Sequence, residues 1–502
     1  MSEKQSILSA AINNIIVRFG QQLISLSKHI IIAGFIGLSN QLDIFYMSLA
    51  IYGVLITSWA VVFDVLAIPK LVEYQLKKQY ENFNLLSSSI LIFTFCISIF
   101  FSIIFYFFGN ILSYSAFGFS YEKKIILEES FKWLFPAIIF YLPYFALCSI
   151  LKSLRLFSLV NLIEFFSTLL VVLILVLFIE KDFVLYWSYS LSIAFSFSLA
   201  FLSVKKSVDF KLVNPLNKLF NKLLPSIPPL LFIHSFFYLF ALTDRFFVTY
   251  LDNGDISALT YATVFVISIP QIIGTSSFFL TAYSEEIDAA QKSSKFSKST
   301  SYILLVSIPI VVFFLSASES LISIILERGA FTESDTFRVT KIIYILSFII
   351  IPFSIQAVID QIYQVEKKFS YVVKIKIFGF LINIYLNYIF IFSLDLGVVG
   401  AAMGTTISYS LVMILSLYNL KNLKIDIKLI NHFIWFSWLL IFNLPVILII
   451  NIIKDYFYND YLIIITTVFN LFLLTLVAVS TFFGPEKKLT FEIFRRIKKL
   501  NI

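Results

Sequence analysis

The sequence predicts an all-α integral membrane protein with about fourteen transmembrane helices. Three observations support this fold class. Hydrophobic residues make up 59% of the 502-residue chain and charged residues only 14%, with a mean hydropathy of +0.93. Apolar runs long enough to cross a hydrocarbon core of about 30 Å recur along the chain. Successive loops alternate between loops that are rich in basic residues and loops that are poor in them. Because so much apolar surface exceeds what one globular core hides, lipid must be the second solvent.

The apolar runs are separated mostly by short loops, so neighbouring helices are expected to be antiparallel. Their predicted ranges are 9–37, 44–67, 85–108, 131–152, 157–179, 184–204, 224–250, 258–283, 300–325, 340–364, 370–393, 397–419, 430–452 and 461–484.

Most of the 38 basic residues lie in one alternate set of loops and in the C-terminal tail. The opposite set of loops holds seven: Lys123, Lys124, Lys181, Arg328, Arg338, Lys341 and Lys454. By the positive-inside rule, both termini are predicted to be cytoplasmic. The net charge of +8 then follows from topology and does not indicate nucleic acid. The tail, residues 485–502, is predicted to be a basic amphipathic helix on anionic headgroups.

A weak internal repeat suggests two related halves. A shift of 216 residues aligns 27–32 with 243–248, and a shift of 212 aligns 157–160 with 369–372. The sequence therefore predicts two six-helix lobes, 1–210 and 220–425, related by a pseudo-two-fold axis along the membrane normal. Two additional spans, 430–484, fall outside the repeat. This architecture places a site between the two bundles and allows alternating access.

Basic residues inside predicted spans are the first candidates for function. Each costs about 2.5–3.5 kcal/mol at the centre of a helix. Lys28 and Arg18 are ten residues apart, nearly three helical turns, so they can share one face. Arg245 is the third candidate. One interpretation pairs Lys28 and Arg18 with Asp43 or Asp64; the other has them line a cavity and bind an anionic headgroup.

Carboxylates in or near the spans are candidates either for coupling transport to protons or cations, or for structural ion pairs. They are Asp43, Asp64, Glu164, Asp244 and Asp360. No cofactor is expected beyond coupling to a cation or to the membrane potential.

The chain shows no sign of an enzyme. The three histidines, His29, His234 and His432, are scattered, and neither a metal-ligand pattern nor a nucleophile–base set stands out. Cys96 and Cys148 are expected to be buried packing residues. We therefore expect no catalytic residue and no metal site.

Several segments resemble the lipid II flippase family (MurJ/MviN), within the multidrug, oligosaccharidyl-lipid and polysaccharide exporter superfamily. The strongest match is residues 327–336 (ERGAFTESDT), followed by Asp244-Arg245 with residues 254–259 (GDISAL). Residues 67–74 (AIPKLVEY) and 42–46 (LDIFY) are also similar, and 397–402 (GVVGAA) recurs across the superfamily.

The resemblance implies a flippase for a polyprenyl-diphosphate-linked saccharide in the bacterial inner membrane. It further implies that Lys28, Arg18 and Arg245 bind the diphosphate. The expected partners are the lipid-linked glycan, membrane lipids and cell-envelope synthesis proteins, with the chain a monomer. The family's four cationic positions fall on Gln22, Lys28 and, approximately, Ile56 and Val264, so one of them keeps a charge.

This departure leaves alternatives open for the substrate and the function. An exporter of O-antigen or capsule units would keep the fold and change the cavity. A multidrug or cation antiporter of the same fold should rely on carboxylates instead. A non-transporting envelope scaffold should tolerate loss of the three basic residues.

Overall fold

The computed structural model describes residues 20, 24–273, 288–366, 368–423, 425, 429–456 and 459–482. Within these ranges the regular secondary structure is helical, apart from an isolated β-bridge between Arg328 and Phe331. Twelve of the described helices are long and apolar enough to cross a membrane. Two shorter apolar helices, Ile24–Ile36 and Asp255–Pro270, lie where the first and eighth spans are predicted. The predicted all-helical membrane fold is confirmed.

The chain divides into two compact units. The first runs to Ile256 and also contains Arg328–Phe331; the second contains Ser257–Glu327 and the residues from Thr332 onward. The lobe boundaries that the internal repeat suggests, 1–210 and 220–425, stay a prediction.

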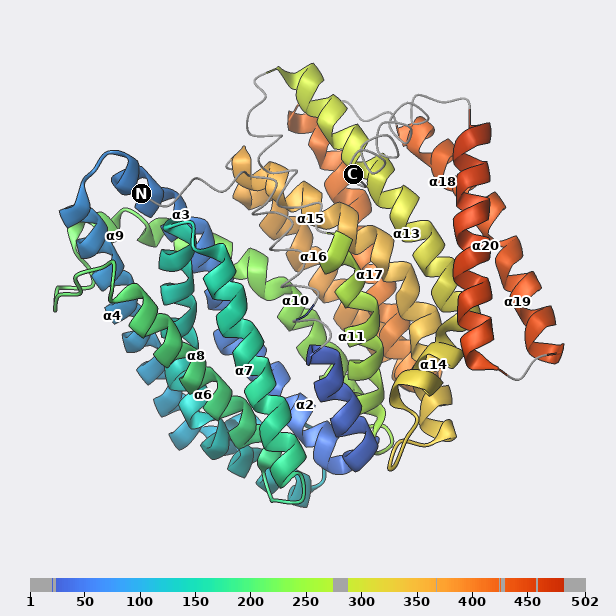
Figure 1. Cartoon of the computed structure of the whole chain (residues 1–502), viewed down its shortest axis with the longest axis horizontal. Helices are drawn as coiled ribbons and strands as arrows, with labels where there is room; N and C mark the ends of the chain where they lie inside the picture. The colour runs from blue at the N-terminus through green and yellow to red at the C-terminus, as the bar shows by residue number, and fades with distance from the viewer. Residues whose placement is uncertain are drawn as a thin grey trace. The chain divides into compact units, whose positions relative to one another are not determined.

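The first unit is built from the helix Ile24–Ile36 and a series of labelled helices (Figure 1). These are α2 (Asn40–Tyr52), a π-turn η1 (Gly53–Thr57), α3 (Ser58–Leu76), α4 (Tyr80–Phe107), α5 (Gly109–Ser113), α6 (Tyr121–Ser153), α7 (Phe157–Phe178), α8 (Val184–Val204), α9 (Lys218–Asn221), η2 (Leu224–Ser226) and α10 (Ile227–Val248).

A π-turn interrupts the span formed by α2 and α3. It begins at Gly53, where an added Cβ would lie 2.9 Å from the ring of Tyr238 on α10. Such turns add a residue to the helix and change the direction of the side chains that follow. Here glycine lets α10 pack directly against the turn.

Tight glycine turns join the ends of several helices in the first unit. Gly37 has φ +63°, and a Cβ there would lie 2.5 Å from the carbonyl oxygen of Ala330. The Ala330 N–H donates to the Gly34 carbonyl at 2.7 Å. Residues 328–331 therefore dock on the end of the first helix, although the helices on both sides of them belong to the second unit.

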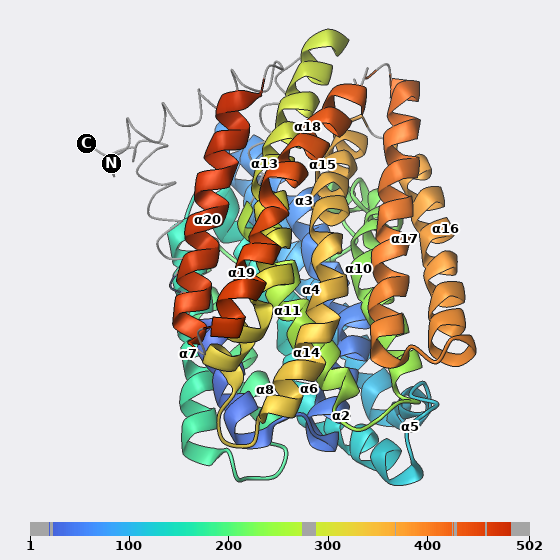
Figure 2. The ribbon, with the colours of Figure 1, turned by 90° about the vertical axis from the view of Figure 1, so that its right-hand side faces the viewer.

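The second unit contains the remaining helices, including the pair α16 and α17, which lie side by side (Figure 2). In order, they are α11 (Asp255–Ile273), α13 (Ala289–Leu326), α14 (Glu333–Leu346), η3 (Ser347–Ile349), α15 (Ile350–Val365), α16 (Phe369–Tyr388), η4 (Ile389–Ser393), α17 (Gly397–Asn419), η5 (Leu420–Leu423), α18 (Leu429–Asn443), α19 (Pro445–Tyr456) and α20 (Asp460–Thr481).

The last two predicted spans, 430–452 and 461–484, pack against the long helix α13. Apolar residues of α13, α19 and α20 form one buried cluster, which includes Val312, Ile450 and Leu471. At the other end, the His432 ring lies between Ser297 and Ser301 of α13, with nitrogen–oxygen distances of 3.1 and 3.4 Å. These contacts attach α18, α19 and α20 to the unit.

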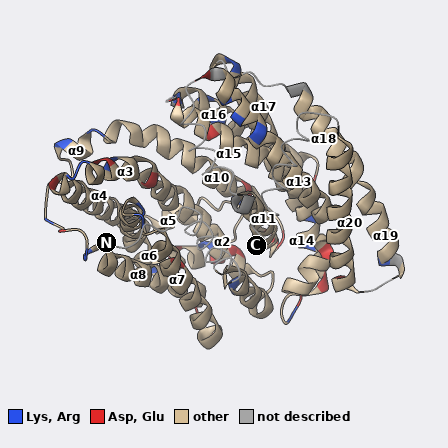
Figure 3. Ribbon diagram, turned by 45° about the horizontal axis from the view of Figure 1, so that its top comes forward, with Lys and Arg blue, Asp and Glu red and all other residues tan. Residues whose placement is uncertain are grey.

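Most of every helix carries no charge, as Figure 3 shows. On such uniformly apolar helices the sequence does not reveal which face turns inward. The two cysteines illustrate this: Cys148 is buried as expected, whereas Cys96 on α4 is exposed. The expectation that both are buried is wrong for Cys96, because a membrane helix presents apolar side chains to lipid as well as to its neighbours.

Candidate functional site

A polar cavity of about 190 Å³ lies inside the first unit. The helix Ile24–Ile36 contributes one residue to it, and α6, α7 and α8 contribute the others. The lining residues are Lys28, Tyr141, Tyr144, Phe145, Glu164, Ser167, Thr168, Val171, Tyr189, Ser192, Ile193 and Ser196. Nine of these twelve side chains carry a polar group. In a chain that is 59% hydrophobic, this cluster of polar side chains marks a candidate site for a polar group, although most of the surface that faces the cavity is apolar.

Lys28 supplies the only basic group among these lining residues. Its ammonium makes no ion pair or hydrogen bond with any residue that the structure describes. A half-buried lysine without a carboxylate partner is costly inside a membrane protein unless a cavity or a ligand compensates the charge. The arrangement can bind an anionic group through charge-assisted hydrogen bonds.

Two of the three tyrosines that line the cavity, Tyr141 and Tyr189, pack against Tyr52, which is fully buried. Tyr52 contacts Tyr141 edge-on with ring centroids 5.5 Å apart, and contacts Tyr189 in the same way at 5.9 Å. Edge-to-face contacts of this kind add about 0.5–1.5 kcal/mol each to the burial of the rings. The position of Tyr52 in α2 therefore fixes one wall of the cavity.

Two of the predicted carboxylates have partners in the first unit. Asp64 pairs with Lys152 and accepts a hydrogen bond from Ser149. Asp43 is buried and accepts a hydrogen bond from the Gly254 backbone N–H at 2.6 Å. Neither forms the ion pair with Lys28 that the structural interpretation requires.

The other predicted basic residues do not line this cavity within the described structure. Arg245 of α10 is half-buried in the same unit, and its Nη1 donates to the Ala241 carbonyl at 3.0 Å. The neighbouring Asp244 is also buried. Arg18 lies outside the described residues, so the predicted grouping of Arg18 with Lys28 and Arg245 stays a prediction.

Asp360 belongs to a polar cluster in the second unit. Its carboxylate accepts from Lys376 Nζ of α16 at 2.7 Å and from Gln356 Nε2 of α15 at 2.7 Å. The Lys376 side chain is only 5% exposed. The pair connects α15 to α16, so its geometry favours a structural ion pair over a coupling site.

Sequence reasoning named Glu164 only as a span carboxylate and did not predict the hydroxyl groups beside it. In the sequence, Glu164 stands out as a carboxylate within an otherwise apolar run. The serines and the threonine of the cavity do not stand out, because Ser and Thr in membrane helices usually bond their own backbone.

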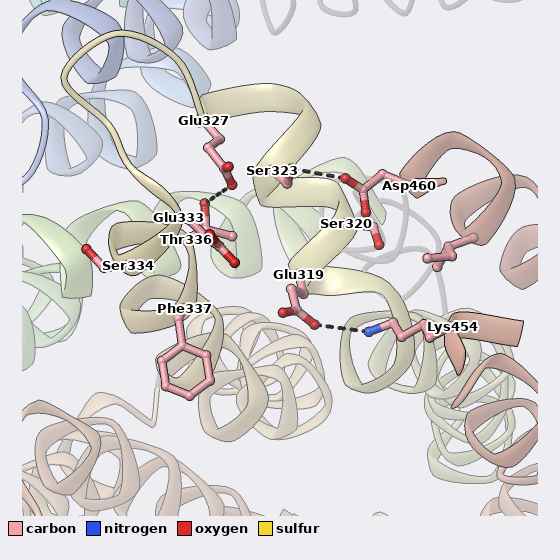
Figure 4. Close-up of a pocket in the computed structure, with 11 residues that line it drawn as sticks. Glu319, Ser320, Ser323, Glu327, Glu333, Ser334, Thr336, Phe337, Lys454 and Asp460 are labelled. Carbon is pink, nitrogen blue, oxygen red and sulfur yellow. Dashed lines mark hydrogen bonds and ion pairs between the residues drawn. The ribbon is translucent and has the colours of Figure 1, made fainter. Parts of the chain in front are cut away.

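A second, larger pocket of about 620 Å³ lies in the second unit and is acidic (Figure 4). Three side-chain contacts cross it: Thr336 donates to Glu327 at 2.8 Å, Ser323 to Asp460 at 3.0 Å, and Lys454 to Glu319 at 3.2 Å. They connect α13 to α14, α19 and α20. Among the described residues no group of three His, Cys, Asp or Glu is arranged to hold a metal.

A model of the lipid II flippase MurJ family matches residues 32–479. The chain belongs to this family.

Three relatives carry the description "probable lipid II flippase MurJ". The one from Buchnera aphidicola is 24% identical over 405 residues, which cover 77% of this chain and 78% of the relative. The one from Rickettsia prowazekii is 29% identical over 46% of this chain and 47% of its own length. The one from Aquifex aeolicus is 26% identical over 38% of this chain and 37% of its own length.

Solved structures show the same fold. A lipid II flippase MurJ in an inward closed conformation superposes with a TM-score of 0.79 at 20% identity, covering 93% of this chain and 98% of that one. An inward-facing multidrug resistance transporter of the MATE family in the MOP superfamily gives a TM-score of 0.63 at 13% identity, covering 82% of this chain and 98% of that one. As a MurJ family member, the chain is a multi-pass membrane transporter.

Proposed function

We propose that this protein flips lipid II, a polyprenyl-diphosphate-linked saccharide, from the cytoplasmic to the outer leaflet of a bacterial inner membrane. Family membership supports the reaction. The structural observation that carries the proposal is Lys28, whose ammonium faces a polar cavity without a partner in the described chain. We assign the diphosphate to Lys28, with Arg18 and Arg245 as further candidate ligands.

The physics of the substrate requires such a cavity. A diphosphate and its sugars are strongly hydrated, and moving them through hydrocarbon without replacing that hydration is prohibitive. A lysine and a set of hydroxyl groups can replace part of the hydration. The polyprenyl tail, in contrast, is already soluble in the bilayer and needs no polar path.

Transport in this direction can draw on the membrane potential. We propose that both termini are cytoplasmic, as the distribution of basic loops predicts. The substrate then carries negative charge away from the negative interior, which contributes about 2.3 kcal/mol per elementary charge per 100 mV. This proposal needs no coupling cation, and it leaves Asp64 and Asp360 their observed structural contacts.

Depletion in the native host tests the function. We expect a lipid-linked disaccharide-peptide to accumulate on the cytoplasmic side when the protein is removed. Accumulation of an O-antigen or capsule unit would instead identify a related polyprenyl-linked glycan as the substrate. A changed substrate would agree with the uncharged residues Gln22, Ile56 and Val264, which stand where the family has arginines. If no lipid-linked glycan accumulates, the flippase proposal is wrong.

A further inference from the structure

The hydroxyl groups that line the cavity of the first unit have already used their hydrogens. Ser167 donates to the Ser192 carbonyl at 3.2 Å, and Thr168 donates to the Glu164 carbonyl at 2.9 Å. Ser192 and Ser196 donate to the carbonyls of Tyr189 and Ser192 at 2.7 and 2.8 Å. A hydroxyl has one hydrogen and two acceptor lone pairs. In this arrangement the four hydroxyls can therefore only accept hydrogen bonds from a ligand.

The charged groups divide the cavity chemically. Glu164 also lines it, and an ionised carboxylate is an acceptor only. Lys28 is a donor only. The cavity thus combines one cationic donor with a wall of acceptors, which we define as Ser167, Thr168, Ser192 and Ser196. A phosphate without an attached sugar can accept hydrogen bonds from Lys28, but it has no hydrogen-bond donor for the four hydroxyl oxygens of the wall.

The cavity is small and partly open to its surroundings, so it holds only one part of a larger ligand. Its volume of about 190 Å³ corresponds to roughly six water molecules at about 30 Å³ each. It is smaller than the range of about 300–1,000 Å³ typical for whole drug-sized ligands. One ring-sized group with several hydroxyl or amide hydrogens suits this volume. The rings of Tyr141 and Tyr189 add aromatic surface, whose negative faces attract C–H groups.

We propose that the acceptor wall binds the sugar that is attached directly to the diphosphate, while Lys28 binds the phosphate. This inference rests on the proposed function, because it assumes a polyprenyl-diphosphate-linked saccharide. It adds that the first unit contributes a subsite for that first sugar. Since the wall and Lys28 share one small cavity, only the sugar adjacent to the phosphate reaches both.

The test removes the acceptors without changing charge. The variant combines Ser167→Ala, Thr168→Val, Ser192→Ala and Ser196→Ala. It should fold, because the serine and threonine hydroxyls bond carbonyls already used within the helices, and alanine has the higher helix propensity. Binding is measured on the full chain in lipid nanodiscs, with a polyprenyl diphosphate carrying its disaccharide and with the same lipid lacking sugar.

We expect the dissociation constant for the glycosylated lipid to rise about tenfold or more. Each neutral hydrogen bond contributes about 0.5–1.5 kcal/mol, and about 1.4 kcal/mol is a factor of ten. Binding of the sugar-free diphosphate should change by less than about twofold. A matched control combines Ser198→Ala and Ser203→Ala on α8, which bond the Ala194 and Leu199 carbonyls but do not line the cavity. It should leave both affinities unchanged.

Two results overturn the subsite. Equal weakening for both lipids would mean that the wall acts on the phosphate or on folding, and unchanged binding of the glycosylated lipid would mean that water satisfies the wall. If the proposed function itself is wrong, the result is distinguishable: the unaltered protein would bind neither lipid. The sugar subsite would then be wrong as well.

Discussion

Lys28 shows how a single side chain changes meaning once its surroundings are known. In the sequence it is a basic residue in the first apolar run, compatible with an ion pair or with a cavity. In the described structure Asp43 bonds Gly254 and Asp64 pairs with Lys152, and neither pairs with Lys28; the pairing of Arg18 lies outside the described residues. Lys28 therefore places an ammonium in a cavity that also contains Glu164 and several hydroxyl groups, where it can bind an anionic group.

Replacing Lys28 should impair substrate binding more than stability. We expect Lys28→Ala to weaken binding of the polyprenyl diphosphate about 10- to 100-fold, since a hydrogen bond to a charged group contributes about 1.5–3 kcal/mol. Lys28→Arg should retain most of the affinity. The measurement is equilibrium binding on purified protein.

Lys132→Ala is the matched control, because Lys132 is an exposed lysine of α6. It should bind like the unaltered protein. Equal losses in the Lys28→Ala and Lys132→Ala variants would mean that net charge, not position, drives binding.

At the scale of elements, ion pairs connect neighbouring helices inside each unit. Asp64 and Lys152 join α3 to α6, and Asp360 and Lys376 join α15 to α16. Such pairs contribute modestly compared with well-packed apolar residues, but removing one partner of the more buried pair, Asp360 and Lys376, leaves a poorly solvated charge. The same carboxylates that look like coupling sites in the sequence therefore have a structural explanation.

Removing one partner of the α15–α16 pair should destabilise the protein strongly. We expect Lys376→Met to cost about 3–5 kcal/mol because Asp360 is left without its ammonium partner. The double variant Asp360→Asn with Lys376→Met should regain most of that stability and should still transport. Thermal unfolding in detergent and a vesicle flipping assay measure the two properties.

The control for this pair is Lys374→Met, two residues away on α16 and exposed. Its unfolding should be unaffected. A stable double variant that no longer transports would show that Asp360 has a coupling role after all.

The glycine turn at Gly37 should be sensitive to a single methyl group. Both Gly37 and Gly397 have positive φ, +63° and +56°, but only at Gly37 would a Cβ meet backbone, 2.5 Å from the Ala330 carbonyl oxygen. We expect Gly397→Ala to cost about 1–2 kcal/mol from backbone strain alone. Gly37→Ala should cost more, as measured by thermal unfolding. Equal costs would mean that residues 328–331 adjust freely.

For the whole molecule, membrane topology rests on charge. The loop of residues 205–222 is rich in lysine, whereas the loop around Asp182 is poor in basic residues. The positive-inside rule therefore predicts that these two loops lie on opposite sides of the membrane.

Cysteine labelling in intact cells tests this topology. In a background with Cys96 and Cys148 replaced by serine, Asp182→Cys should react with a membrane-impermeant thiol reagent added outside. Asp209→Cys should react only after the cells are permeabilised. The reverse pattern would place both termini outside and would contradict the proposed direction of transport.

Much of the fold could be predicted from the sequence, for a physical reason. Burying an unpaired backbone in hydrocarbon is so unfavourable that long apolar runs must be helices. The apolar helices accordingly occur where the runs predict them, and the first and eighth runs also extend beyond the described residues. Hydropathy is a property of each segment by itself, so the spans can be predicted without knowing how the helices pack against one another.

The candidate site could be predicted only in part. Lys28 was recognised because an isolated charge in an apolar run is costly wherever it points. Cys96 and the hydroxyls of α7 and α8 were misjudged or missed, because their meaning depends on which face of a helix turns inward. Hydropathy by itself determined that this chain is a helical membrane protein with a cation in its first span. Only the tertiary structure decided that Lys28 shares one cavity with Glu164 and the hydroxyl groups of α7 and α8, since that depends on the rotation of four helices about their axes.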